Sequence, residues 1–116
     1  DVAEDTIFGK ILRGEIPCKE VYSDDEYFAF RDINPQAPDH ILIIPRKPIP
    51  KISDATEDDR ALLGGLVLKA NDIARTLGLA EDGYRLVINC GKHGGQEVYH
   101  LHLHLLGGRQ MTWPPG

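Results

Sequence analysis

The chain has 116 residues, of which 41% are hydrophobic and 27% are charged, with a formal net charge of −5 at pH 7. We expect one domain over residues 1–116, because this length buries a core without metal or disulfide support, and the ordinary composition excludes disordered and fibrous proteins. The acidic balance argues against unspecific binding to nucleic acid or anionic membranes, no apolar run predicts a membrane span, and two cysteines without C-x-x-C spacing fit a reducing, cytoplasmic location.

The first half of the chain predicts one short helix and three strands. Asp5 and Thr6 offer an N-cap to apolar residues at helical spacing and Gly14 supplies a stop, which predicts a helix over residues 7–13. The elements expected next are two brief strands joined by an Asp-Asp turn, a loop with two prolines, and a β-branched run typical of a central strand, at residues 20–22, 27–32, 34–39 and 40–45.

The second half predicts the longest helix and two more strands. Residues 53–59 are acidic and suit the positive end of a helix dipole, and the apolar spacing that follows predicts a helix over residues 62–77. Strands are expected at residues 84–89 and 98–108, joined by a glycine-rich connection. Because the strands cluster, the predicted class is α+β, with a largely antiparallel five-stranded sheet, one long helix and one short helix.

Residues 98–108 read V-Y-H-L-H-L-H-L-L-G-G, in which histidine and leucine alternate strictly. Period two is a strand signal, and side chains at i, i+2 and i+4 of a strand share one face about 6.5 Å apart. We therefore expect His100, His102 and His104 on one face of a single strand. The intervening leucines should lie under the long helix, so that the histidine face looks toward an open cleft or a partner.

Four interpretations of the histidine face compete. A merely solvated face has no need of a repeated imidazole. A zinc site could add His40, but His100 and His104 would lie about 13 Å apart in a straight strand, too far to share an ion with ligands near 2.0–2.1 Å. A neutral imidazole can attack phosphorus, and His102 is best placed if a backbone carbonyl fixes its Nδ1 so that Nε2 presents the lone pair. A nucleotide-binding module without turnover would use the same site.

The connection before the histidines suits an anion. Gly94 and Gly95 let the main chain approach a phosphate closely, with backbone N–H groups as donors. Asn89 and Gln96 add side-chain amides. The nucleotide-triphosphate loop pattern G-x-x-x-x-G-K-[ST] is absent from the sequence.

H-L-H-L-H-L-L resembles the motif of the histidine-triad (HIT) superfamily, and much of the chain is similar to its Hint branch. The further matching blocks are D-T-I-F-G-K-I, F-R-D-I-N-P-Q-A-P, H-I-L-I-I-P, and the stretch from G-G-Q to W-P-P-G, at residues 5–11, 30–38, 40–45 and 94–116. The resemblance implies a HIT fold whose sheet continues across a homodimer, with the tail 109–116 at the interface.

The resemblance also implies a purine nucleoside phosphoramidase. Such an enzyme cleaves the P–N bond of adenosine 5′-phosphoramidates and related purine nucleoside monophosphate conjugates, and releases AMP and an amine without a metal or cofactor. His102 resembles the nucleophile that forms a nucleotidyl-histidine, and His104, His100 and His40 resemble its catalytic neighbours. The alternative is a non-catalytic purine nucleotide sensor or interaction protein.

Binding roles follow from the same resemblance. Asp32 resembles the carboxylate that accepts the ribose hydroxyls. Glu97 stands where animal Hint enzymes have Ser, near the leaving-group nitrogen, and Trp113 is expected to reach the partner's site. The apolar residues implied for the purine slot would be assigned to the core from pattern alone, and they are Phe8, Ile11, Phe30, Ile33 and Leu42. The residues implied for the phosphate region are Asn89, Gly95, Gln96 and Val98.

Overall fold

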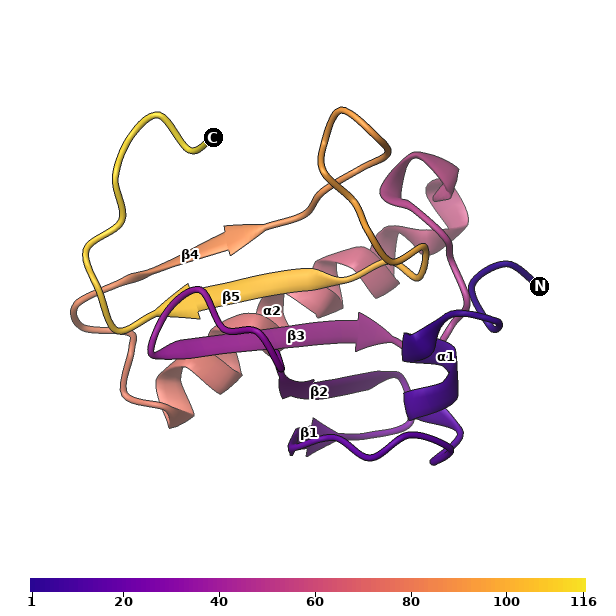
Figure 1. Ribbon diagram of the computed structural model, residues 1–116, viewed down its shortest axis with the longest axis horizontal. Helices are drawn as coiled ribbons and strands as arrows, with labels where there is room; N and C mark the ends of the chain where they lie inside the picture. Colours follow the sequence, from indigo (N-terminus) through magenta and orange to yellow (C-terminus); the bar gives the residue numbers. More distant parts are fainter.

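Five antiparallel strands form one sheet with the order β1-β2-β3-β5-β4, and the long helix α2 covers one face (Figure 1). The computed structural model describes residues 1–116. The predicted α+β class is confirmed. The elements are α1 Ile7–Leu12, β1 Glu20–Ser23, β2 Tyr27–Arg31, β3 Asp39–Pro45, the 3₁₀ turns η1 Ile52–Asp54 and η2 Glu57–Asp59, α2 Arg60–Thr76, β4 Tyr84–Val87 and β5 Leu103–Gly107. None of the helices combines the length and the apolar composition that a membrane crossing requires.

Local signals set the helix ends. The hydroxyl of Thr6 accepts a hydrogen bond from the Gly9 N–H at 3.1 Å, which caps α1 as predicted, and Gly14 follows its end at φ +75°. The acidic approach to α2 forms two 3₁₀ turns, in which the Asp59 carboxylate accepts from the Thr56 N–H at 2.9 Å. Gly78, at φ +76°, follows the end of α2.

The larger apolar cluster lies between α2 and the sheet. Leu103 and Leu105 of β5 are 2% and 0% exposed and pack in the same cluster as Leu66 and Ile73 of α2. Burying a leucine side chain contributes about 1.5–3 kcal/mol, so this layer supplies much of the stability. The prediction that the leucines of the last strand lie beneath the long helix is confirmed for Leu103 and Leu105, whereas Leu101 precedes the strand and is not part of this cluster.

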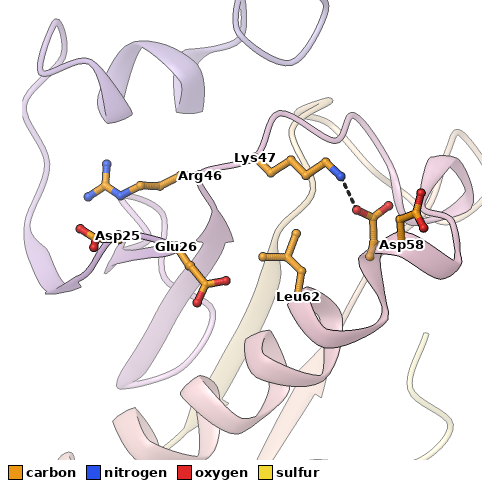
Figure 2. A pocket seen from close by; sticks show the side chains of 7 residues that line it. Asp25, Glu26, Arg46, Lys47, Asp58 and Leu62 are labelled. Carbon is orange, nitrogen blue, oxygen red and sulfur yellow. Dashed lines mark hydrogen bonds and ion pairs between the residues drawn. The ribbon is translucent and has the colours of Figure 1, made fainter.

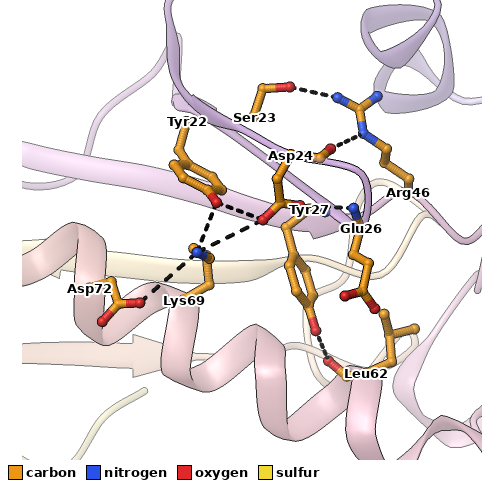
Figure 3. Close-up of polar contacts among 9 residues, drawn as sticks. All are labelled: Tyr22, Ser23, Asp24, Glu26, Tyr27, Arg46, Leu62, Lys69 and Asp72. Atoms are coloured by element: carbon orange, nitrogen blue, oxygen red, sulfur yellow. Dashed lines mark hydrogen bonds and ion pairs between the residues drawn. The ribbon is translucent and has the colours of Figure 1, made fainter.

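Polar contacts attach the β1–β2 hairpin to α2 (Figure 3). Lys69 of α2 donates to the Tyr22 hydroxyl at 2.9 Å, and that hydroxyl donates to the Asp24 carboxylate at 2.6 Å. The Tyr27 hydroxyl donates to the Leu62 carbonyl at 2.6 Å. The hairpin at the sheet edge is therefore tied to the helix by side chains as well as by its ladder.

The opposite face of the sheet carries a smaller cluster that α1 partly covers. It contains one residue of α1 and four residues of the central strands, which are Phe8, Phe28, Phe30, Leu42 and Ile44. In the β2–β3 register Phe30 pairs with Leu42, and in the β3–β5 register Leu42 pairs with His104. Directly paired residues point to the same side, so the histidine side of β5 continues this apolar surface.

The strand that carries the histidines is shorter than predicted. β5 begins at Leu103, so only His104 of the three histidines lies in the ladder. The carbonyl of His100 accepts a hydrogen bond from the ring of His102 instead of pairing with a strand. The facing loop after β3 is rich in proline, which lacks the N–H that a ladder needs. The prediction of one strand face that carries all three histidines is wrong in this respect.

Candidate active site

Three histidine rings and one phenylalanine ring form a continuous row on the open face of the sheet. His40 enters from the start of β3 and His104 from β5, and their ring centroids are 5.1 Å apart. The centroids of His104 and His102 are 5.0 Å apart. The rings of His102 and Phe8 are arranged edge-on, with their centroids also 5.0 Å apart. Residues that are distant in the chain therefore make one site.

The hydrogen bond of His102 fixes its tautomer. Its Nδ1 lies 2.8 Å from the carbonyl oxygen of His100, which can only accept, so Nδ1 carries the proton. Nε2 of the neutral ring therefore holds a lone pair. The carbonyl contact expected from the sequence is present, and it leaves His102 with a nucleophilic nitrogen at 7% exposure.

A second chain of hydrogen bonds fixes the tautomers of His40 and His104. The backbone N–H of Gln36 donates to Nδ1 of His40 at 3.0 Å, so the proton of His40 lies on Nε2. That Nε2 donates to Nδ1 of His104 at 2.9 Å. Nε2 of His104 is then an N–H donor, and it is buried without a partner in the chain. A buried orphan donor is rare, and this one needs an acceptor that a ligand would bring.

The row is uncharged near neutral pH. Burial, followed by the neighbouring rings of His102 and His40, lowers the pKa of His104 to about 4. Burial also lowers the pKa of His102 and of His40 from the ordinary value of 6.5. Desolvation disfavours the imidazolium form, so the lone pair of His102 is available without prior deprotonation.

Asp32 lies beside the far end of the row, just after β2. Its Oδ1 accepts from the Asn34 N–H at 2.8 Å, and its Oδ2 lies 3.4 Å from Nε2 of His40. Its charge raises the pKa of His40 against the larger effect of burial. One carboxylate oxygen is thus held by its own loop, and the other faces the histidines.

Asp32, His40 and His104 also place three possible metal-ligand atoms within 4.8 Å of one another. The hydrogen bonds do not suit a metal. A histidine that binds a metal through one ring nitrogen carries its proton on the other nitrogen, which donates away from the metal. In His40 the arrangement is reversed: Nδ1 accepts from the Gln36 amide, so the proton lies on Nε2, the nitrogen that faces Asp32 and His104. Binding a metal there would require the bond to Gln36 to break.

Four of the five residues implied for the purine slot lie together beside His102. Phe8, Phe30 and Leu42 belong to one buried cluster, and Ile11 packs against it. Phe8 meets Phe30 edge-on, with centroids 5.3 Å apart. Ile33 is 100% exposed on the loop after β2, so packing within the chain does not bring it into the cluster.

The loop before β5 is held by Gln96. Its Oε1 accepts from the Gly91 N–H at 3.0 Å, and its Nε2 donates to the carbonyls of Pro50 and Val98 at 2.9 and 3.0 Å. The amide is therefore used within the chain, and the expectation that it adds a free donor for phosphate is wrong in this structure. Val98 packs against the Phe8 cluster, which joins the loop to the slot.

The other implied residues of this region are open. Asn89 is half-buried, and its side-chain amide makes no hydrogen bond in the chain. Gly95 has φ +77° with open space around its Cα, and Glu97 is exposed and forms no ion pair. Trp113 is 81% exposed, and its ring lies 5.9 Å from the guanidinium of Arg85 on β4.

His100 stands apart from the row. It is 1% exposed, and its Nε2 donates to the carbonyl of Pro45 at 2.8 Å. Sequence reasoning expected a backbone carbonyl at Nδ1 of His102 without identifying it as that of His100, and it did not find the Gln36 amide that sets the His40 ring. Side-chain patterns carry no signal for such partners.

A surface hollow lies away from this row. It has a volume of about 280 Å³ and is lined by Arg46, Lys47, Glu26 and Leu62 among others, with the Lys47–Asp59 ion pair at its side (Figure 2). None of the residues implied for the site lines it. The candidate site is defined by the ring row and its orphan donor rather than by the shape of the surface.

Known proteins resemble this chain over nearly its whole length. The HIT domain family matches residues 13–111. A HIT-like protein of Synechocystis is 60% identical over 115 residues, which cover 99% of this chain and 100% of that protein. A HIT family hydrolase from Legionella pneumophila has a crystal structure with a TM-score of 0.95 at 57% identity, covering 97% of this chain and 100% of that chain.

A more distant structure shows the same fold. The histidine triad nucleotide-binding protein from Candida albicans gives a TM-score of 0.80 at 30% identity, covering 95% of this chain and 83% of that chain. The family match spans the three histidines and the loop before them. The chain belongs to the HIT family.

Proposed function

We propose that this chain is a nucleotide hydrolase that cleaves the P–N bond of adenosine or other purine 5′-phosphoramidates through a nucleotidyl-histidine intermediate. The observation that carries the proposal is the pair of fixed tautomers. Nε2 of His102 holds a lone pair, and the adjacent ring of His104 offers a buried N–H without a partner. A nucleophile beside an unused donor suits attack at phosphorus with charge developing on a phosphoryl oxygen.

In the first step, the lone pair of His102 Nε2 forms a bond to the α-phosphorus, and the P–N bond breaks. The amine leaves with the bonding electrons and takes a proton, for which we assign the carboxyl group of Glu97, an exposed residue of the loop before β5. The N–H of His104 stabilises the negative charge on the phosphoryl oxygen. In the second step, water attacks phosphorus and gives a proton back to the Glu97 carboxylate, the bond between phosphorus and His102 Nε2 breaks with its electrons returning to Nε2, and AMP is released.

The remaining groups would hold the nucleoside. Phe8, Ile11, Phe30 and Leu42 form an apolar surface next to the nucleophile, which suits a purine ring. The carboxylate of Asp32 is an acceptor that can take two adjacent ribose hydroxyls. The Legionella relative is described as a hydrolase and the Candida relative as nucleotide-binding, which supports both parts of this proposal.

Release of AMP from an adenosine phosphoramidate tests the proposal. His102→Ala is expected to lower kcat by at least about 10³-fold while AMP still binds, because the nucleophile is lost and the slot remains. Mass spectrometry of a rapidly quenched reaction should find a nucleotide adduct on the parent chain and none on the variant. AMP binding by the parent without any turnover would support the nucleotide sensor and contradict the hydrolase.

We also infer that the chain forms a homodimer through the β4 edge of the sheet. β4 has a strand neighbour on one side only, and exposed apolar side chains lie on α2, after β4 and in the tail, at Val67, Leu68, Ile88 and Trp113. An unpaired edge flanked by apolar groups is suited to pair with a second copy. Sedimentation equilibrium should give twice the chain mass, and a monomer would contradict the inference.

A further inference from the structure

The residues before α1 fold back against that helix, and the N-terminus lies near it (Figure 1). Ala3 is 0% exposed, and its carbonyl accepts from the Thr6 hydroxyl at 2.7 Å. The guanidinium of Arg13, at the end of α1, donates to the carbonyl of Glu4 at 2.7 Å. This segment, residues 1–6, is thus folded by its own hydrogen bond and fastened to the end of α1, a helix of only six residues, through Arg13.

Close packing of this segment depends on Gly9. A Cβ added there would lie 2.3 Å from the carbonyl oxygen of Glu4 and 2.9 Å from that of Ala3. Both contacts are with backbone, which cannot turn aside as a flexible side chain could. Any larger residue at this position must separate residues 1–6 from α1.

The segment and α1 lie beside His100. Glu4, Gly9 and Arg13 line the same hollow of about 300 Å³ as His100. Burial lowers the pKa of His100, and the carbonyls of Pro45 and Ala3 oppose this by raising it. At 1% exposure the His100 ring is buried, and its Nδ1 has no hydrogen-bond partner in the chain.

The backbone of His100 orients the nucleophile. Its carbonyl accepts the Nδ1 proton of His102, and the next backbone N–H, that of Leu101, donates to the carbonyl of Ile49 at 2.7 Å. The hydrogen bond from the His100 ring to the Pro45 carbonyl also holds residues 100 and 101 in place. A shift of His100 would move the one acceptor that keeps the proton off Nε2 of His102.

We propose that residues 1–6 form a positioning element for the nucleophile and act through His100, which is a positioning residue rather than a catalytic one. The expected loss of rate rests on the proposed function, whereas the expected change in the tautomer of His102 does not. Contact with the buried ring holds the His100 backbone, the His100 carbonyl holds the tautomer of His102, and the tautomer presents the lone pair. Loosening the segment therefore lowers the rate of attack without removing any group that touches the substrate.

The first test compares Gly9→Ala with Gly64→Ala, because an added Cβ at Gly64 meets no atom within 4 Å. Gly9→Ala is expected to lower kcat roughly 10- to 100-fold with KM nearly unchanged, whereas Gly64→Ala keeps the parent rate. In nitrogen NMR, the ring of His102 in Gly9→Ala should gain the tautomer with the proton on Nε2. Unchanged kcat and spectrum overturn the proposal, and so does a raised KM at unchanged kcat, which would assign the effect to a shift of Phe8.

The second test separates a positioning role of His100 from a chemical one. His100→Gln keeps an N–H where Nε2 lies, and His100→Met has a similar length without a donor. Thermal unfolding checks that both fold, and His100→Gln is expected to retain most of kcat while His100→Met loses it. An equal loss in both variants overturns the positioning role. If the parent shows no turnover, the proposed function fails, and the tautomer of His102 in these variants still decides this inference.

Discussion

The two faces of the sheet differ in how completely apolar packing covers them and in the polar groups that they carry. On the α2 face, eleven buried residues form one apolar cluster, and the prominent polar contacts are those that tie the hairpin to the helix. On the other face, the apolar cluster has five buried residues and stands beside three neutral histidine rings and an unused N–H donor. The histidine face can keep a polar group without a hydrogen-bond partner because the larger cluster beneath α2 supplies most of the stability. Stability and chemistry therefore lie on opposite faces of the same sheet.

The largest effect is expected from adjacent leucines that point to opposite faces. Leu105→Ala should lower the free energy of unfolding by about 2–5 kcal/mol, because Leu105 is 0% exposed beneath α2. Leu106→Ala, at a half-buried position paired with His40, should cost clearly less. Urea unfolding measures both. Equal losses would show that the faces are not energetically distinct.

Lowering the pH should decrease the free energy of unfolding through the buried histidines. The pKa of His104 is about 4 in the folded chain and near 6.5 when unfolded, so the unfolded chain binds more protons between these values. Stability is therefore present above pH 6.5 and falls as the pH is lowered toward 4. Urea midpoints across this range measure the slope, and His104→Gln should flatten it while His93→Gln, on an exposed loop, should not. A slope that His104→Gln leaves unchanged contradicts this origin.

A smaller effect, confined to the open face, is expected from Glu97→Ser. The substitution should change the ranking of amine leaving groups by several-fold in kcat/KM and leave AMP affinity nearly unchanged, because Glu97 is exposed and forms no ion pair. Cationic, neutral and anionic amines are compared, with Glu81→Ser as the matched exposed control. The same ranking in parent and variant would sink the idea.

The smallest effect on the fold is expected from removing residues 111–116. These residues lie outside both clusters, and five of the six are exposed. On the proposed homodimer, the shortened chain should stay folded and dimeric with altered substrate selectivity, measured by sedimentation and by kcat/KM over several phosphoramidates. Monomers, or selectivity identical to the parent, would contradict a role of the tail at the partner's site.

The alternation of histidine and leucine correctly predicted that His104 points away from the face of Leu103 and Leu105, because side-chain direction in an extended chain is a local property. It did not predict where β5 begins, since that depends on the prolines of a loop about fifty residues earlier in the chain. The family resemblance brought Phe8, Phe30 and Leu42 together, and the structure places them in one cluster. It could not show that the Gln96 amide is already used, because its partners are distant backbone groups.

The hydrogen-bond chain from Gln36 through His40 to His104 has a fixed direction. Every N–H in it points toward the site, and its far end is a backbone amide, which does not release its proton at any pH that the fold survives. This series of hydrogen bonds can therefore stabilise negative charge on an oxygen next to His104. It cannot relay a proton, because a proton given away by His104 would not be replaced from the Gln36 amide. The proton that a departing amine needs must enter from the solvent side, so the basicity of that amine, rather than the histidine row, sets how much help it requires.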